Sequence, residues 1–428
     1  MRARRVRSFL VALVALVALT LAVGAFTERG GAADSGRTTA APAGLAQVVR
    51  GQPSATPQGY TPSFIRDYYH FSTLGKDAKG NPITGTGQTI AIVLYGDYPE
   101  APADLQAFID EFKLQPMLGL DGKACTPSGY DAEPCFEIVN AGGKVPPTAD
   151  EAAEREYALD IEWAHAAAPG ANIVMVQGQA ATPIDLTTAI QAAVSAKATV
   201  VSMSFSSANM NKGTASIWDG SSVAFVASEG DNGYPDATYP AADANVLAVG
   251  GTSITASGEE AWVDTGGGPT RVPRPDYQVN WSSSDFREVN DVAYNAWGDL
   301  YAVALQTGPT PPPEWITVGG VSAGVPQWAG IIADADQLRV SEGKSILARD
   351  GVMAGLYLAA SDGGKLPHGD IDQAYFKDIT TGCADAYTAP PGEPTGPCVK
   401  DATKGYDELT GLGSPNVASL VEYLGNDV

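Results

Sequence analysis

The sequence predicts an α/β protein whose sheet is mostly parallel and covered by helices on both faces. From Tyr60 onward, short apolar runs rich in β-branched residues alternate with longer segments of helical periodicity. The apolar runs are continuous, as in strands buried on both faces, and do not alternate with polar residues. No second linker divides the chain after residue 57, so we expect one large domain over residues 58–428, although the length alone would also allow two.

The predicted elements follow one another in alternating order. We expect strands at 89–95, 171–176, 199–205, 223–227 and 246–249, and helices at 101–112, 151–168, 184–196 and 325–338. The stretch 252–317 is rich in Gly and Pro, which predicts long surface loops with room for one hairpin. The chain has no internal repeat.

Residues 1–25 have the layout of a secretory signal peptide. Four arginines (Arg2, Arg4, Arg5 and Arg7) precede an apolar run from Phe9 to Val23, and small residues follow at Gly24-Ala25. The run is short for a membrane span, although an uncleaved signal anchor remains the alternative. Residues 26–57 are rich in Gly, Ala, Thr and Pro and predict a flexible leader. We therefore expect a secreted, extracellular protein without stable membrane association.

The chain is strongly acidic. It has 49 acidic and 26 basic residues and a formal charge of −23. Such a surface disfavours binding to nucleic acid and to anionic membranes. The charge suits an acidic medium, because protonation of carboxylates relieves their mutual repulsion. A merely soluble secreted protein explains the same composition equally well.

The four cysteines fall into two local pairs, Cys125 with Cys135 and Cys383 with Cys398. An even number of cysteines in an exported chain favours disulfides, and closure of two short loops is the most economical of the three possible connectivities. A metal site at these cysteines is disfavoured because no histidine is near either pair.

Glu156 and Asp160 lie four residues apart in the predicted helix at 151–168, which contains neither Gly nor Pro and stops at Pro169-Gly170. The spacing places both carboxylates on one face, about 5–6 Å apart at Cβ, where like charges repel by roughly 0.2–0.5 kcal/mol. A site that needs a shared proton tolerates that cost.

Ser322 lies in the glycine-rich turn Gly319-Gly320-Val321-Ser322-Ala323-Gly324-Val325-Pro326. A serine hydroxyl is a poor nucleophile until a base takes its proton, and that base is usually histidine. We expect the histidines (His70, His165 and His368) to be structural or exposed, since none stands in a His-Gly-Thr-type helix start. A glutamate serves instead if a neighbouring carboxylate raises its pKa and the medium is acidic.

Asp231 lies in the loop Ala227-Ser228-Glu229-Gly230-Asp231-Asn232-Gly233, directly after a predicted strand. This places it at the carboxyl edge of the sheet, where open α/β sheets have their sites. A protonated Asp231 donates a hydrogen bond to a transition-state oxyanion, whereas the ionised form repels it. Taken alone, an Asp between glycines is more often a turn residue.

Several segments, in this order, resemble the sedolisin family of serine-carboxyl peptidases. They are Glu156-x-x-x-Asp160-Ile161-Glu162 with Ala168-Pro169-Gly170-Ala171, Gly230-Asp231-Asn232-Gly233 with Tyr239-Pro240-Ala241-Ala242, Val246-Leu247-Ala248-Val249-Gly250-Gly251-Thr252, Val289-Asn290-Asp291-Val292-Ala293, Gly319-Gly320-Val321-Ser322-Ala323-x-x-Pro326, Asp378-Ile379-Thr380, and Gly405-Tyr406-Asp407-x-x-Thr410-Gly411-Leu412-Gly413-Ser414-Pro415. The resemblance covers residues 58–425. It implies a subtilisin-like fold and cleavage of peptide bonds in acid.

The resemblance also implies a role for each site residue. Ser322 would be the nucleophile, Glu156 its general base, Asp160 the group that orients and tunes Glu156, and Asp231 the oxyanion donor. One structural Ca²⁺ is implied near the C-terminus, with carboxylates from Asp378 and Asp407 and carbonyls from Ile379, Thr403 and Gly405. We expect an active endopeptidase that takes protein or peptide substrates and is a monomer.

The chain departs from the family pattern at several positions. Val321 stands where Thr usually precedes the serine, and Ser202-Met203-Ser204-Phe205-Ser206 stands where the substrate strand usually reads Ser-x-Ser-Trp-Gly. Leu94 occupies the position at which some members extend the catalytic set with a glutamate, and Thr403 replaces a usual Gly. Family precursors typically carry a large pro-domain, whereas residues 26–57 are all that separates the predicted signal from the catalytic-like region.

Two other readings compete with this one. Gly320-Val321-Ser322-Ala323-Gly324 also fits the G-x-S-x-G nucleophile elbow of α/β-hydrolases, which would need His368 as its downstream histidine. The second is a catalytically inactive, secreted binding protein on a peptidase scaffold.

Overall fold

The computed structural model describes residues 48–125, 133–207, 222–306, 313–366, 369–386 and 398–428. The predicted signal peptide and most of the predicted leader lie outside these residues. Their predictions therefore stand as expectations only.

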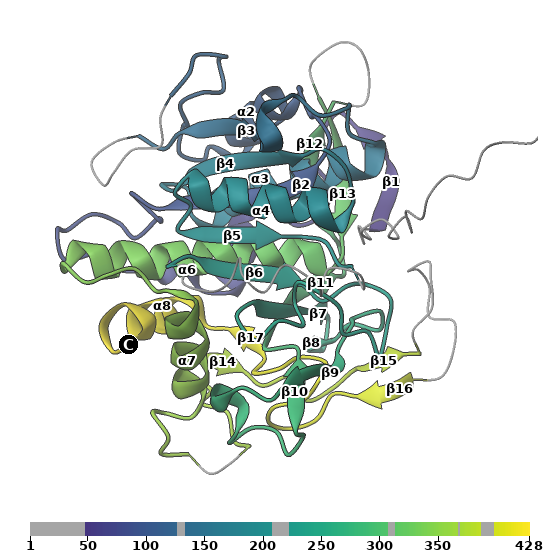
Figure 1. The fold of residues 1–428 in the computed structure, drawn as a ribbon, viewed down its shortest axis with the longest axis vertical. Helices are drawn as coiled ribbons and strands as arrows, with labels where there is room; N and C mark the ends of the chain where they lie inside the picture. The colour runs from purple at the N-terminus through teal and green to yellow at the C-terminus, as the bar shows by residue number, and fades with distance from the viewer. Residues whose placement is uncertain (1–47, 126–132, 208–221, 307–312, 367–368, 387–397) are drawn as a thin grey trace, which may run out of the picture. The chain divides into compact units, whose positions relative to one another are not determined.

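An eight-stranded sheet forms the centre of the fold (Figure 1). Its strands run in the order β11-β7-β6-β5-β2-β4-β3, all neighbours being parallel, and β8 adds to β7 in antiparallel fashion. The strands are β2 (Thr89–Tyr95), β3 (Phe136–Asn140), β4 (Asn172–Gly178), β5 (Val200–Met203), β6 (Ala224–Ser228), β7 (Leu247–Thr255), β8 (Gly258–Ala261) and β11 (Val292–Trp297). The predicted mostly parallel α/β architecture is confirmed.

Helices cover both faces of this sheet, as the continuous apolar runs predict. On one face α3 (Glu151–Ala167) and α6 (Gly324–Ser341) pack against each other, and α4 (Pro183–Ser195) crosses β2 and β4 on the other (Figure 1). The remaining helices are α1 (Pro62–Tyr68), α2 (Ala101–Phe112), α7 (Arg349–Ala360) and α8 (Val417–Asn426), with short 3-10 turns at η1 (Phe71–Thr73), η2 (Ala141–Gly143), η3 (Asp276–Gln278) and η4 (Val321–Ala323).

The loops predicted for 252–317 are corrected by the structure. This stretch contains β8, β11 and three further strands, β9 (Gly268–Pro273), β10 (Phe286–Val289) and β12 (Tyr301–Leu305), and it runs into β13 (Glu314–Gly319). All five residues of β12 are buried, so this part of the stretch belongs to the core and is not a surface loop. β12 pairs with β13, and β13 pairs with β1 (Val48–Ser54), so the leader prediction is also corrected for residues 48–54.

The C-terminal part of the chain packs on the helix that follows Ser322. Arg339 of α6 donates through one guanidinium nitrogen to the carbonyls of Leu424 and Val428, at 3.0 and 2.7 Å. A Cβ on Gly425 of α8 would stand 2.4 Å from Leu338 Cδ2, so only glycine permits this approach. Four short strands complete this part: β14 (Phe376–Lys377), β15 (Cys383–Asp385), β16 (Cys398–Asp401) and β17 (Ser414–Pro415).

Both predicted disulfides are confirmed. Cys125 is bonded to Cys135 and Cys383 to Cys398, with Cα atoms 5.9 and 5.7 Å apart. The second bond links β15 to β16, which also pair as strands.

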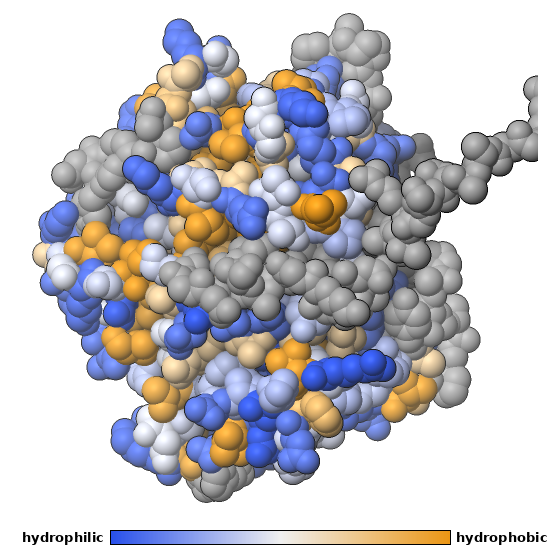
Figure 2. All heavy atoms as spheres, in the orientation of Figure 1, coloured by the Kyte–Doolittle hydropathy of each residue, from blue (hydrophilic) through white to orange (hydrophobic). Residues whose placement is uncertain are grey.

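On the face shown in Figure 2, apolar side chains form scattered patches among hydrophilic ones. Within the described part of the chain, every helix is too short or too polar to cross a bilayer.

Candidate active site

Helix α3 carries two carboxylates into the protein interior. It begins where the Asp150 side chain caps it, with Oδ1 accepting from the Ala153 N–H at 2.9 Å. From Glu156 to Ala167 every residue is buried, because the helix packs against β2 and β4 of the sheet and against α2, α6 and β12. Glu156 and Asp160 are both 0 % exposed. The predicted common face therefore points into the core, where neither carboxylate reaches bulk water.

Ser322 lies in the tight turn that joins β13 to α6. The turn begins at Gly320, whose φ of 124° and ψ of 166° place it in a region open in practice only to glycine. The 3-10 turn η4 follows and leads directly into α6. Ser322 is 1 % exposed and is held at the amino end of a long buried helix.

Asp231 reaches Ser322 from the carboxyl end of β6. Gly230, at φ 110°, turns the chain after this strand. Asp231 Oδ1 accepts a hydrogen bond of 2.9 Å from the N–H of Val321, the residue before the serine. Its other oxygen, Oδ2, is buried without a hydrogen-bond partner. One oxygen is thus committed to fixing the serine turn, and the other is left for a further partner.

Burial dominates the electrostatics of Glu156. Loss of water raises its pKa well above the ordinary value, and the nearby Asp160 carboxylate raises it further, while the neighbouring Ser322 hydroxyl counteracts the rise. The serine oxygen is therefore placed against the carboxyl that sequence reasoning assigned as its base.

Asp160 and Asp231 also have raised pKa values. Burial raises the pKa of Asp160, and the Ser204 hydroxyl, which donates to Asp160 Oδ1 at 2.9 Å, opposes this rise. Burial likewise raises the pKa of Asp231; the Val321 N–H opposes it, and the charge of Glu156 adds to it. The three acids therefore favour protonated states, and they lie in one cluster with the Ser322 hydroxyl.

The structure thus brings all four sequence-predicted residues into one buried cluster. Ser204 is the member that sequence reasoning missed. It follows β5, and its hydroxyl fixes the carboxylate of Asp160 across 44 positions of the chain. The signal was present in Ser202-Met203-Ser204, which the sequence assigned only to a substrate strand.

The histidines in the described part of the chain stand apart from this cluster. His165 is buried on α3, its Nε2 lies 2.8 Å from the Gln115 carbonyl, and burial lowers its pKa to about 4. His70 Nδ1 lies 3.2 Å from Asn416 Oδ1. His368, which the α/β-hydrolase reading needs, lies outside the described residues. Ser322 moreover follows β13, an antiparallel strand of a separate three-stranded sheet, whereas a nucleophile elbow follows a strand of the central sheet.

The predicted calcium ligands come together near the C-terminus. Asp378 Oδ2 accepts from the Gly405 N–H at 3.0 Å, and Asp407 Oδ2 accepts from the Thr403 N–H at 2.7 Å. Asp378 Oδ1 is buried without a hydrogen-bond partner, as expected of an oxygen that faces a cation. Together with the carbonyl of Ile379, the set offers only oxygen ligands from loops, which fits Ca²⁺.

No cluster of three or more His, Cys, Asp or Glu side chains suited to a metal occurs in the described ranges. The predicted set contains only two acidic side chains, so its remaining ligands would be backbone carbonyls.

Comparisons with known proteins give a consistent picture. No protein-family model matches the chain. Kumamolisin of Bacillus sp. (strain MN-32) is 29% identical over 415 residues, covering 87% of this chain and 64% of kumamolisin. The probable tripeptidyl-peptidase SED2 of Arthroderma benhamiae is 30% identical over 210 residues, covering 44% of this chain and 31% of that protein. The chain therefore spans less than two thirds of these relatives.

The solved structure of Pseudomonas sedolisin, a serine-carboxyl proteinase complexed with two molecules of pseudo-iodotyrostatin, is similar with a TM-score of 0.64 and 22% identity. It covers 87% of this chain and 99% of that one. This similarity supports the subtilisin-like fold.

Proposed function

Because this chain belongs to the sedolisin family of serine-carboxyl peptidases, we propose that it is an exported, acid-active endopeptidase that cleaves protein or peptide substrates through an acyl-enzyme on Ser322. One observation carries the proposal. The Ser322 hydroxyl stands against Glu156, whose carboxyl interacts with both Asp160 and Asp231 in a cluster closed to bulk water. The export is supported by the signal-like residues 1–25, and a monomer remains our expectation.

In the acylation step, Ser322 Oγ attacks the scissile carbonyl carbon while its proton passes to the Glu156 carboxylate. The developing oxyanion accepts a hydrogen bond from protonated Asp231, for which Oδ2 is the oxygen without a partner. The C–N bond then breaks as Glu156 returns the proton to the leaving amine. Asp160 shares the negative charge with Glu156, and Ser204 keeps Asp160 in place.

In the deacylation step, Glu156 takes a proton from water, which attacks the acyl carbon. The second tetrahedral state uses the same Asp231 donor, and as the bond between the acyl carbon and Ser322 Oγ breaks, Glu156 returns the proton to Oγ and the carboxylic acid is released. Both steps need Asp231 protonated and the Glu156–Asp160 pair holding a proton. The raised pKa values of all three groups support an acidic working range.

The decisive experiment tests covalent capture of Ser322. The secreted protein is incubated at pH 3–5 with a peptide aldehyde, a transition-state analogue for serine attack, and bound adduct is located by mass spectrometry of the intact chain and its fragments. We expect an adduct on Ser322 that is lost in Ser322→Ala. If wild-type protein forms no adduct at any of these pH values, the inactive binding scaffold becomes the better account.

Digestion of a peptide library at pH 3–7 distinguishes the modes of cleavage. An endopeptidase cuts at internal bonds irrespective of distance from the termini, whereas a tripeptidyl-peptidase releases fragments of fixed length from one end. The Ser322→Ala variant is the control for contaminating activity. We expect internal cleavage with a rate that falls as the pH rises, and optimal cleavage at pH 8 would contradict the required protonation of Asp231.

Calcium is proposed as a structural ion held by Asp378 and Asp407 with carbonyls of Ile379, Thr403 and Gly405. A bound cation would neutralise the two carboxylates and fasten the surrounding loops. We expect chelation to lower the melting temperature by about 3 °C or more, since a ligand at 100 times its Kd contributes about 2.7 kcal/mol. Asp378→Asn should melt early and lose its response to chelator.

The matched control is Asp401→Asn, an exposed acid on β16 outside the set. It should respond to chelator as the unaltered protein does. An unchanged melting temperature of the wild type in chelator would remove the ion from the proposal.

A further inference from the structure

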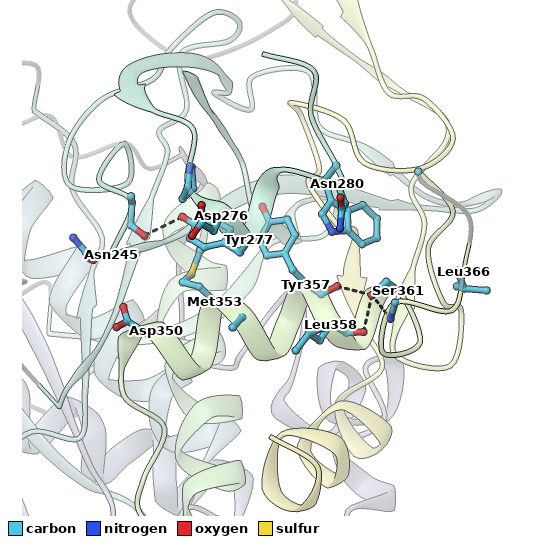
Figure 3. A pocket seen from close by; sticks show the side chains of 16 residues that line it. Asn245, Asp276, Tyr277, Asn280, Asp350, Met353, Tyr357, Leu358, Ser361 and Leu366 are labelled. Carbon is cyan, nitrogen blue, oxygen red and sulfur yellow. Dashed lines mark hydrogen bonds between the residues drawn. The ribbon is translucent and has the colours of Figure 1, made fainter. Parts of the chain in front are cut away.

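Figure 3 shows a cavity of about 790 Å³ whose lining includes no residue of the cluster around Ser322. It is bounded by η3, by α7 and by Ala244 and Asn245, which precede β7. Asp231 follows the carboxyl end of β6, and β6 is parallel to β7. The cavity therefore lies at the edge of the sheet where β7 begins. Asp231, which contacts the serine turn, lies at the opposite edge. A molecule bound in the cavity is therefore not placed for attack by Ser322.

Aromatic rings form the inner walls. The ring centroids of Tyr277 and Tyr357 are 5.0 Å apart, and those of Trp281 and Tyr357 are 6.0 Å apart in an edge-to-face arrangement. Met353 of α7 lies beside them and is 2 % exposed. A volume of this size is within the range of about 300–1,000 Å³ that small-molecule sites occupy.

These walls are held in place without a ligand. The Tyr277 hydroxyl donates to the Ala244 carbonyl at 2.9 Å and accepts from Arg287 at 2.7 Å. The Tyr357 hydroxyl donates to Asp291 Oδ1 at 2.8 Å. Both hydroxyls are thereby tied to the buried Arg287–Asp291 pair, whose two hydrogen bonds measure 2.9 and 2.6 Å. A site with fixed walls loses less side-chain freedom on binding than a mobile one.

The charge of the cavity is negative. Its lining residues include Asp276 and Asp350 and contain no Lys, Arg or His. Figure 3 shows these two acids at the same end of the cavity, on either side of Met353. Arg349 neutralises part of the Asp350 charge at 3.1 Å, and Asp291 offsets the charge of Arg287 behind the tyrosines. Asp276 is exposed at the mouth and faces no basic lining residue.

We propose that this cavity binds an organic cation, an ammonium or guanidinium group on an apolar or aromatic body. Aromatic faces attract such cations, the rings and Met353 receive the body, and Asp276 faces the charge. The cation can be a free small molecule or a Lys or Arg side chain of a polypeptide. The site is distinct from the one at Ser322 and does not depend on the proposed peptidase activity.

Titration with phenethylammonium and with 2-phenylethanol, an uncharged analogue of similar shape, tests the proposal by ligand-observed NMR on the full-length secreted protein. We expect the ammonium compound to bind with a Kd on the order of 1 mM, as small fragments do, and the alcohol to bind at least about tenfold more weakly. Equal binding of the two compounds would overturn the assignment of a cation site.

Two variants place the binding in the cavity. Ala354→Trp fills the cavity from an exposed position of α7 and should abolish binding. Asp276→Asn should weaken binding of the ammonium compound about five- to tenfold and leave binding of the alcohol unchanged. Asp110→Asn, an exposed acid on α2, is the matched control and should bind as the wild type does. Wild-type affinity in Ala354→Trp would overturn the proposal.

The two sources of the cation are separated with peptides. The peptide Gly-Gly-Lys-Phe-Gly-Gly and its norleucine counterpart are titrated into the Ser322→Ala variant, which prevents cleavage. If the lysine peptide binds more tightly than phenethylammonium, the cation that the cavity binds is a side chain of a polypeptide. If phenethylammonium binds and the lysine peptide does not, the cation that the cavity binds is a small free molecule.

Discussion

Replacing Ser322 with alanine is expected to lower kcat at pH 4 by at least about 10⁴-fold while the protein stays folded. The substitution removes only the hydroxyl that is placed against Glu156, and loss of a nucleophile in a serine peptidase of similar fold costs about 10⁶-fold. The volume change is small at a residue that is 1 % exposed, so the melting temperature should move little. Turnover is measured with a fluorogenic peptide and folding by circular dichroism.

Glu156→Gln should produce a loss of similar size, because the amide keeps the shape of the side chain but cannot take the serine proton. Glu162→Gln is the matched control. Glu162 lies on the same helix, is equally buried and also has a pKa raised by burial, but its Oε2 accepts from the Ala304 N–H, away from the serine. Wild-type turnover in Glu156→Gln, or an equal loss in Glu162→Gln, would refute the assigned role of Glu156.

Raising the pH from 4 to 8 is expected to destabilise the folded protein by several kcal/mol. Burial raises the pKa of Asp104 to about 6 and that of Asp336 to about 7, and it raises the pKa values of Glu162, Glu229 and Asp334. Because these acids hold protons more tightly when folded than when unfolded, their contribution is complete below about pH 4 and is lost as the pH rises to 6–7 and above. Asp336 alone contributes on the order of 4 kcal/mol.

Urea unfolding of the Ser322→Ala variant, which cannot digest itself, measures this effect between pH 4 and pH 8. Asp336→Asn in that background should be less sensitive to pH, since Asn keeps the oxygen that accepts from the Leu347 N–H and cannot ionise. Asp110→Asn, at an exposed position, should behave as its parent. A midpoint that is equal or higher at pH 8 would contradict the prediction.

Much of the central fold was predictable from local pattern. The ranges predicted for β2 and α2 agree with the structure at both ends, since each has a strong signal and a clear boundary. The strands of 252–317 were not predictable in this way, because β12 owes its place to pairing with β13, which in turn pairs with β1 from the beginning of the described chain. Helix α7 was missed because it contains Gly351 and Gly355, which weaken helix propensity.

The acid cluster was predictable in membership and only partly in geometry. The spacing of Glu156 and Asp160 within one helix fixes their common face, so their meeting needs no tertiary information. Ser204 contacts Asp160 only after β5 and α3 have packed, and the hydrogen bond from Val321 to Asp231 joins segments 90 positions apart. No local pattern encodes either contact.

The C-terminal residues have a consequence for the timing of activity. The backbone carbonyl of Asp385 accepts a hydrogen bond of 2.8 Å from the Tyr234 N–H and thereby supports the loop that carries Asp231. Arg339 of α6, the helix that begins after Ser322, donates to carbonyls at the C-terminal end of the chain, in and just after α8. A nascent chain that has emerged only as far as α6 already contains every proposed reacting group but lacks both of these supports. On the proposed function, competence to cut would then arise only after the C-terminal segment has been synthesised and has folded.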